Sequence, residues 1–239
     1  SMTKKSRKTK PDFSLPQSGW KTTSILYTEN FFFFVKLSLI FILFSLPIFT
    51  VFASITAMNY VISKIINDRL VFIWDDFLKA FKSNFLRSTL YGILSSVIFV
   101  LLMLGWNISN QITALPSLFQ MILKVFYIFI GIVLILHTVY FYSIQAWIDL
   151  PFRSVLRNAM LIQFVAYKTT LKIFLILIVV IPFIWIFRPI TYFLIPFFSA
   201  TIVFLINSYA MQPIQKYLII KKPEEDPAFN DSNDIHINI

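Results

Sequence analysis

The chain of 239 residues contains no cysteine, which excludes disulfide bonds, thiolate metal ligands and thiol catalysis. It has only four glycines, and they form no seam of small residues of the kind that lets two membrane helices approach closely. Charged residues are also scarce, at 13%, whereas 58% of the residues are hydrophobic. A chain of this composition has more apolar surface than one soluble core can bury. The sequence therefore indicates a membrane protein.

Long blocks of Phe, Ile, Leu and Val recur between Phe31 and Ala210. Most are close to the length of about 20 residues that an α-helix needs to cross a bilayer. Four predicted spans are clear, and they are 88–106, 119–143, 170–187 and 190–210. The predicted fold is an all-α polytopic membrane bundle with five or six spans.

The number of spans depends on the first apolar stretch, 31–66, which Pro47 interrupts. One interpretation is a single span, 31–52, followed by a surface helix. The other is a tight hairpin of two short spans, 31–47 and 50–66. The second half of this hairpin is short for a span and carries several polar residues, so it is also compatible with partial insertion.

The 21 Lys and Arg residues help to choose between these models, because positive charges accumulate in cytoplasmic loops. A six-span model with both termini inside leaves only Lys124 and Arg188 near the outer face. A five-span model puts the basic N-terminal arm on the opposite side from the other three basic segments. We therefore favour six spans, or a first element that enters the membrane and returns.

The chain divides into three predicted parts. Residues 1–24 are expected to form a flexible, basic cytoplasmic arm, residues 25–220 the membrane domain, and residues 221–239 an acidic, disordered tail. The net charge of +10 does not indicate a nucleic-acid partner. The positive charges lie beside apolar spans, where they set the topology of a membrane protein.

Two charged segments between spans, 75–87 and 151–163, carry apolar and polar residues at helical spacing. Each predicts an amphipathic helix that lies on the inner membrane surface and leads into the next span. Such a helix either only seats the following span or also docks a partner protein, and the pattern suits both roles. The candidate docking residues on the polar sides are Asp75, Asp76, Lys79, Lys82, Arg153, Arg157 and Asn158.

Ionisable groups are almost absent from the predicted spans, and all eleven acidic residues lie outside them. His137 is well inside its span, at a depth of roughly 9 Å given the rise of a helix. It is either a proton or ligand contact or a helix–helix hydrogen bond. We favour the hydrogen bond, because a lone histidine without a carboxylate makes a poor relay. The candidate intramembrane polar residues are Asn59, His137, Gln145 and Asn207.

The sequence contains no glycine-rich phosphate loop and no Ser/His/Asp set with recognisable spacing. Its two histidines lie far apart, which does not favour a metal site. We therefore expect no catalytic residues, no cofactor and no metal, and a protein that is not an enzyme.

Several segments together carry a family pattern: Ser45-Leu46-Pro47-Ile48-Phe49-Thr50 with Thr56-Ala57-Met58-Asn59-Tyr60, the run from Asp76 to Phe85, the run from Asp149 to Ala159, and Gln212-Pro213 followed by Tyr217. In order and spacing they resemble the YesL family, a bacterial membrane family of unknown function. The resemblance covers about residues 25–220. One departure is that family members often carry Gly-Pro just after the Pro-x-x-Thr stretch, where this chain has Phe52-Ala53.

The resemblance implies an accessory membrane subunit of a carbohydrate ABC importer, since family members tend to be encoded beside sugar importers of Gram-positive bacteria. The implied partners are the lipid bilayer and the permease subunits of the importer, with any sugar or oligosaccharide contact only indirect. The implied location is the bacterial cell membrane, with both termini in the cytoplasm. The alternative is a stand-alone small-solute transporter or channel, which needs a polar path through the spans.

Overall fold

The computed structural model describes residues 20–67, 69–111 and 116–219. These residues form helices and short connections without a strand, so the prediction of an all-α bundle is confirmed. The elements are α1 (Trp20–Glu29), α2 (Phe31–Ser45), η1 (Ile48–Thr50), α3 (Val51–Ile66), α4 (Ile73–Gln111), α5 (Ser117–Trp147), α6 (Phe152–Val165), α7 (Tyr167–Ile186), α8 (Arg188–Ile214) and the π-helical turn η2 (Gln215–Ile219). Most of the predicted N-terminal arm and all of the predicted tail lie outside the described residues, and α1 begins inside the range given to the arm.

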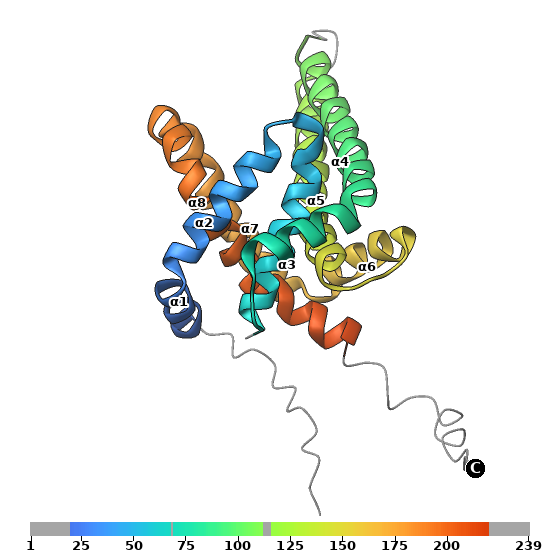
Figure 1. The fold of residues 1–239 in the computed structure, drawn as a ribbon. Helices are drawn as coiled ribbons and strands as arrows, with labels where there is room; N and C mark the ends of the chain where they lie inside the picture. Colours follow the sequence, from blue (N-terminus) through green and yellow to red (C-terminus); the bar gives the residue numbers. More distant parts are fainter. Residues whose placement is uncertain (1–19, 68, 112–115, 220–239) are drawn as a thin grey trace, which may run out of the picture.

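The stretch 31–66 forms two helices, α2 and α3, with a turn between them at Pro47. Proline has no backbone N–H and restricts the residue before it, so a helix cannot continue unchanged through this position. The structure therefore has a helical hairpin here instead of a single span over 31–52. In Figure 1 α2 rises to the turn and α3 descends from it through the centre of the bundle.

Five helical segments are long and apolar enough to cross a membrane, and they are Ile48–Ile66, Ile73–Gln111, Ser117–Trp147, Tyr167–Ile186 and Phe197–Leu218. A sixth candidate is the pair Thr23–Glu29 and Phe31–Ser45, whose two helices are bent by 76° at Asn30. The prediction of a polytopic bundle with five or six candidate spans agrees with this count.

The two amphipathic segments differ in form. Residues 75–87 are the first part of α4, a continuous helix of 39 residues, because neither proline nor glycine separates them from the span that follows. Residues 151–163 correspond instead to a separate helix, α6, which follows Pro151 and ends before Ala166. In Figure 1 the first part of α4 runs across the molecule before the helix turns upward, and α6 lies beside the lower part of α5.

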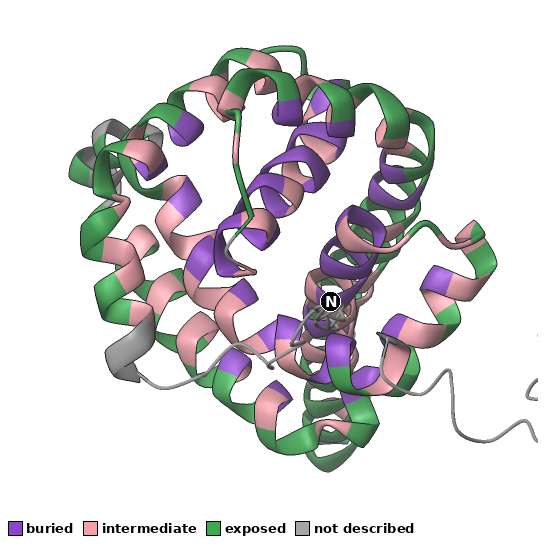
Figure 2. Cartoon of the chain, turned by 60° about the horizontal axis from the view of Figure 1, so that its bottom comes forward, coloured by how far each residue is buried: buried purple, intermediate pink, exposed green. Residues whose placement is uncertain are grey.

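Buried residues gather on α3, on the second half of α5 and on α8, whereas α4, the first half of α5 and α7 expose large apolar side chains over long stretches. Figure 2 shows the buried positions in purple on inner helices and the exposed positions in green, mostly on the outside of the bundle. Helices with apolar outer faces and a buried central helix are expected where lipid, not water, surrounds the protein. We call the lower side of Figure 1 the basic side. It carries α1, the connection from α3 to α4, α6 and η2.

Candidate functional site

A polar cavity of about 410 Å³ lies on the basic side of the bundle, between α3, α4 and α5. This volume is within the range of about 300–1,000 Å³ that is typical of small-molecule sites. Its polar and aromatic lining residues are Tyr60, Lys79, Ser83, Asn84, Arg87, Gln145, Trp147 and Asp149. We take this cavity as the candidate site because charged and amide side chains line it, whereas the cavities between α5 and α7 and between α7 and α8 are lined almost entirely by apolar side chains.

One wall of the cavity comes from the first part of α4. Lys79, Ser83 and Arg87 are four residues apart, so they lie above one another on one face of the helix. This is the polar face of the predicted amphipathic segment. The amphipathic pattern thus positions two cations at the cavity, although it gives no indication of what lies opposite them.

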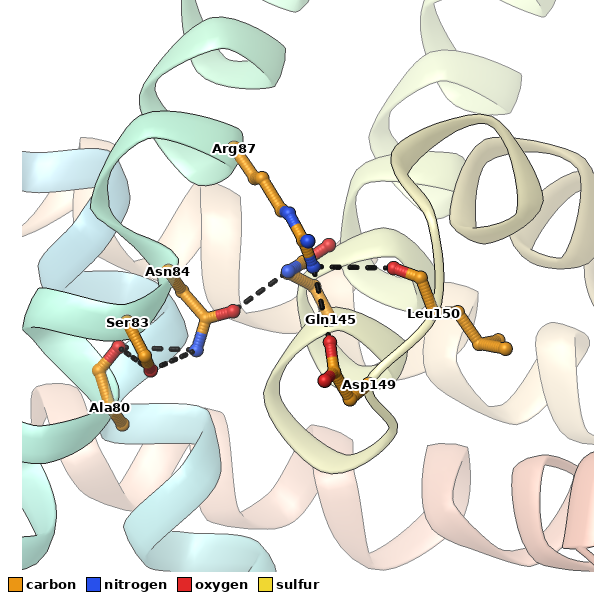
Figure 3. Close-up of polar contacts among 7 residues, drawn as sticks. All are labelled: Ala80, Ser83, Asn84, Arg87, Gln145, Asp149 and Leu150. Carbon is orange, nitrogen blue, oxygen red and sulfur yellow. Dashed lines mark hydrogen bonds and ion pairs between the residues drawn. The ribbon is translucent and has the colours of Figure 1, made fainter.

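Arg87 connects this wall to the link between α5 and α6 (Figure 3). Its Nη1 donates to Oδ1 of Asp149 over 3.2 Å and to the backbone oxygen of Leu150 over 3.4 Å. The side chains of Arg87 and Asp149 are 45% and 96% exposed, so water screens the ion pair and it contributes little stability. Arg87 can therefore move to another anion at low cost.

The opposite wall carries Gln145, a residue predicted as a candidate intramembrane polar group. Its Nε2 donates to Oδ1 of Asn84 over 2.7 Å, and Asn84 in turn donates to the backbone oxygen of Ala80 over 3.1 Å (Figure 3). The carbonyl oxygen of Gln145 is buried and has no hydrogen-bond partner. A buried acceptor without a donor is costly, which makes this wall a place where a bound donor group would add stability.

The charges of the lining residues favour an anionic or polar group. Lys79 and Arg87 contribute two positive charges and Asp149 one negative charge. Asp149 is the one carboxylate among these lining residues, so they include no carboxylate pair for general acid–base chemistry. Among the described residues no group of three or more His, Cys, Asp or Glu side chains comes together to hold a metal. The arrangement is suited to binding.

His137 lies apart from the cavity and joins three helices. Its Nε2–H donates to the backbone oxygen of Leu156 on α6 over 3.2 Å, and its Nδ1 lies 2.8 Å from the hydroxyl of Tyr91 on α4. Both ring nitrogens therefore have partners on other helices, which agrees with the interpretation of His137 as a helix–helix contact.

Asn59 and Asn207 form a second, separate cluster inside the bundle. Nδ2 of Asn207 donates to Oδ1 of Asn59 over 2.7 Å, and the hydroxyl of Ser143 donates to Oδ1 of Asn207 over 2.7 Å. All three side chains are buried, and they connect α3, α5 and α8. The structure thus brings together two of the four predicted intramembrane residues and leaves His137 and Gln145 at two other places.

The predicted docking residues lie on the basic side, and the structure separates one of them from the rest. Asp76 is buried, and its Oδ2 accepts from Nζ of Lys64 over 2.7 Å and from the backbone N–H of Phe72 over 2.9 Å. This gives Asp76 an intramolecular role at the start of α4. The other candidates are half-buried Asn158 and the exposed residues Asp75, Lys79, Lys82, Arg153 and Arg157.

Sequence reasoning did not select Asn84, Arg87, Tyr91 or Ser143 as site residues. Arg87 and Asn84 lie on the polar face of the amphipathic segment, and this position could have identified them as candidate site residues. Tyr91 and Ser143 occur within apolar runs, and only the packing of helices far apart in the sequence gives them partners.

The fold and the cavity define a multi-pass, all-α membrane protein with a polar site at one rim. Residues 30–106 match the model of a family described as a protein of unknown function, DUF624. The YesL family is a DUF624 family, so the resemblance is confirmed over this segment, which includes α2, α3 and most of α4. No curated protein and no solved structure matches the chain.

Proposed function

We propose that this protein is a non-enzymatic accessory subunit of a carbohydrate ABC importer in the bacterial cell membrane, with both termini in the cytoplasm. The resemblance to the YesL family supports the type of partner, and the charge distribution supports the orientation. In this proposal the basic side faces the cytoplasm, where the permease and ATPase subunits of the importer provide acidic and apolar docking surfaces.

One observation carries the proposal. The intramembrane polar residues Asn59, His137 and Asn207 are hydrogen-bonded to other residues of this chain. Charged and polar groups that another molecule can reach lie at the basic rim, on the exposed faces of α4 and α6 and in the cavity. A protein in which these three intramembrane side chains are hydrogen-bonded within the chain, and whose rim is charged, is suited to contact a partner at that rim.

Affinity purification of the full-length, tagged protein from its native host in mild detergent, followed by mass spectrometry, tests this proposal. We expect permease and ATPase subunits in near-stoichiometric yield. The variant Arg153→Glu/Arg157→Glu should lose them, because it reverses the charge of the exposed face of α6. The matched control is Asn110→Asp/Gln111→Glu, at the far end of α4, which should keep them. A homogeneous preparation without importer subunits would refute the accessory role.

The cavity favours a second candidate function, a stand-alone transporter or channel for a small solute. Its volume and its polar lining would suit a substrate site at the membrane rim. Proteoliposomes that contain only this protein decide the question. Flux that depends on Arg87 and Gln145 would support transport, and the absence of any solute flux would exclude it.

A further inference from the structure

The turn between α2 and α3 is apolar and exposed. Its large side chains Leu46, Ile48 and Phe49 are 71%, 85% and 61% exposed, and Pro47 lies among them. No charged residue occurs between Lys36 and Lys64. A turn in water normally carries Gly, Asn, Asp or Ser, so this composition is typical of a turn that faces lipid.

Contacts between α3 and α4 show how deep the turn lies. The ring of Phe52 packs against Gly92, and the hydroxyl of Thr56 lies 2.6 Å from that of Ser88. The two helices are antiparallel, so moving four residues along α3 toward the turn, from Thr56 to Phe52, corresponds to moving four residues along α4 toward its C-terminal end, from Ser88 to Gly92. The turn is therefore level with about position 96 of α4.

The far end of α4 continues well beyond that level. Its densest run of exposed apolar residues extends from Ile93 to Leu104, just before Gly105. Leu104 is eight residues beyond position 96, which corresponds to about 12 Å of helix. The turn thus lies about 12 Å inside the apolar layer that α4 defines on the side opposite the basic side.

The same estimate can be made from the basic side. Lys36 on α2 is exposed, and a lysine at this place extends its ammonium to the membrane–water interface. Pro47 follows eleven residues later, which is about 16 Å along α2 and therefore the greatest depth that the turn can have from this interface. Both depths are close to half of the roughly 30 Å thickness of a hydrocarbon core, which places the turn near the midplane.

Backbone polar groups at the turn are hydrogen-bonded within the chain, as a position in lipid requires. Pro47 brings no N–H group, and the backbone N–H of Thr50 donates to the Pro47 oxygen over 2.9 Å. The hydroxyl of Thr50 lies 2.5 Å from the oxygen of Phe44 and 2.6 Å from that of Pro47. These contacts supply donors to carbonyls at the end of α2, which lipid cannot do.

We propose that α2 and α3 form a re-entrant hairpin, which enters from the basic side, turns near the bilayer midplane and contacts lipid acyl chains with Leu46, Ile48 and Phe49. The complete crossings are then α4, α5, α7 and α8. This inference is independent of any importer, since it concerns how the chain itself meets the membrane.

Single-cysteine variants test the hairpin directly, because the chain has no native cysteine to remove. Ile48→Cys and Phe49→Cys report on the turn, and Asn110→Cys at the far end of α4 is the matched control. The purified full-length variants are reconstituted into phosphatidylcholine vesicles that carry nitroxides at known acyl-chain depths, with a fluorescent label on the thiol. A membrane-impermeant maleimide measures access from water in parallel samples.

We expect the label at both turn positions to be quenched most by nitroxides near the ends of the acyl chains, and the label at position 110 by nitroxides near the headgroups. Maleimide should react with the turn thiols at least about tenfold more slowly than with the control, because the reactive thiolate does not form in an apolar layer. Turn labels with the same depth and reactivity as the control would overturn the hairpin. Turn positions whose labels no lipid nitroxide quenches, and whose thiols maleimide does not reach, would also overturn it, since protein would then cover the turn.

Discussion

The ring of Phe52 on α3 occupies the space that a side chain at Gly92 on α4 would need. A Cβ atom built at position 92 would lie 2.1 Å from Cγ of Phe52, far inside van der Waals contact. Phe52 thus fills the space in front of Gly92 on the facing helix. This pair sets how closely the first turn of α3 approaches α4.

Gly92→Ala should therefore destabilise the protein by about 1–3 kcal/mol, the usual cost of overpacking a filled interface. The measurement is the thermal unfolding midpoint, Tm, of the purified variant in detergent. Gly131→Ala is the matched control, because a Cβ there meets nothing within 4 Å, and replacing a helical glycine stabilises by about 0.5–1 kcal/mol. In the Phe52→Ala background the substitution at 92 should lose its cost, and an unchanged cost there would contradict the steric explanation.

Asp76→Asn should lower stability by about 3 kcal/mol, because it leaves the ammonium group of Lys64 largely buried without its partner. The two side chains are only 16% and 12% exposed and lie 2.7 Å apart. Asp75→Asn is the control, since this neighbouring carboxylate is exposed, and it should change stability by less than about 0.5 kcal/mol. Equal Tm values for the two variants would show that the Lys64–Asp76 pair does not hold α3 to α4.

The membrane bundle itself could be predicted from the sequence, because apolar length and the positions of Lys and Arg are properties of the chain alone. The turn at Pro47 could also be predicted from the sequence, because proline lacks a backbone N–H and interrupts a helix at its own position. The continuity of α4 through 73–111 could not be predicted in the same way. The sequence pattern of an amphipathic helix that continues into a span is the same as that of two separate helices, so it does not show whether a break lies between them.

The candidate site was only partly predictable. Gln145 and Lys79 could be selected individually, because polar side chains are rare in this chain, whereas Asn84 and Arg87 were not selected. Their grouping depends on which helices pack together, and one sequence does not contain that information. Asn59 and Asn207 illustrate this limit, because 148 positions separate two side chains that share a hydrogen bond.

Asn207→Leu should destabilise the bundle by about 1–3 kcal/mol, because Oδ1 of Asn59 then stays buried without a donor. The loss is confined to the interior, so Tm should fall while the exposed residues of α6 are unaffected. Ser208→Ala on the same helix is the control, because its hydroxyl donates to the Phe204 oxygen of its own helix. A Tm of Asn207→Leu equal to that of the control would mean that the amide cluster contributes nothing to the packing of α3 against α8.

Thr50 offers the most direct energetic test of a turn inside the membrane. Thr50→Val keeps the shape of the side chain but removes the hydroxyl that serves the oxygens of Phe44 and Pro47. The Pro47 oxygen keeps the backbone N–H of Thr50 as a donor, so the Phe44 oxygen is the one that loses its partner. In water this oxygen would bind solvent and the cost would be small, whereas in lipid it stays without a donor. We expect a loss of about 1–2 kcal/mol in bilayers. Thr50→Ser retains the hydroxyl and should stay close to the parent protein, so equal stability of the Val and Ser variants would place the turn in water.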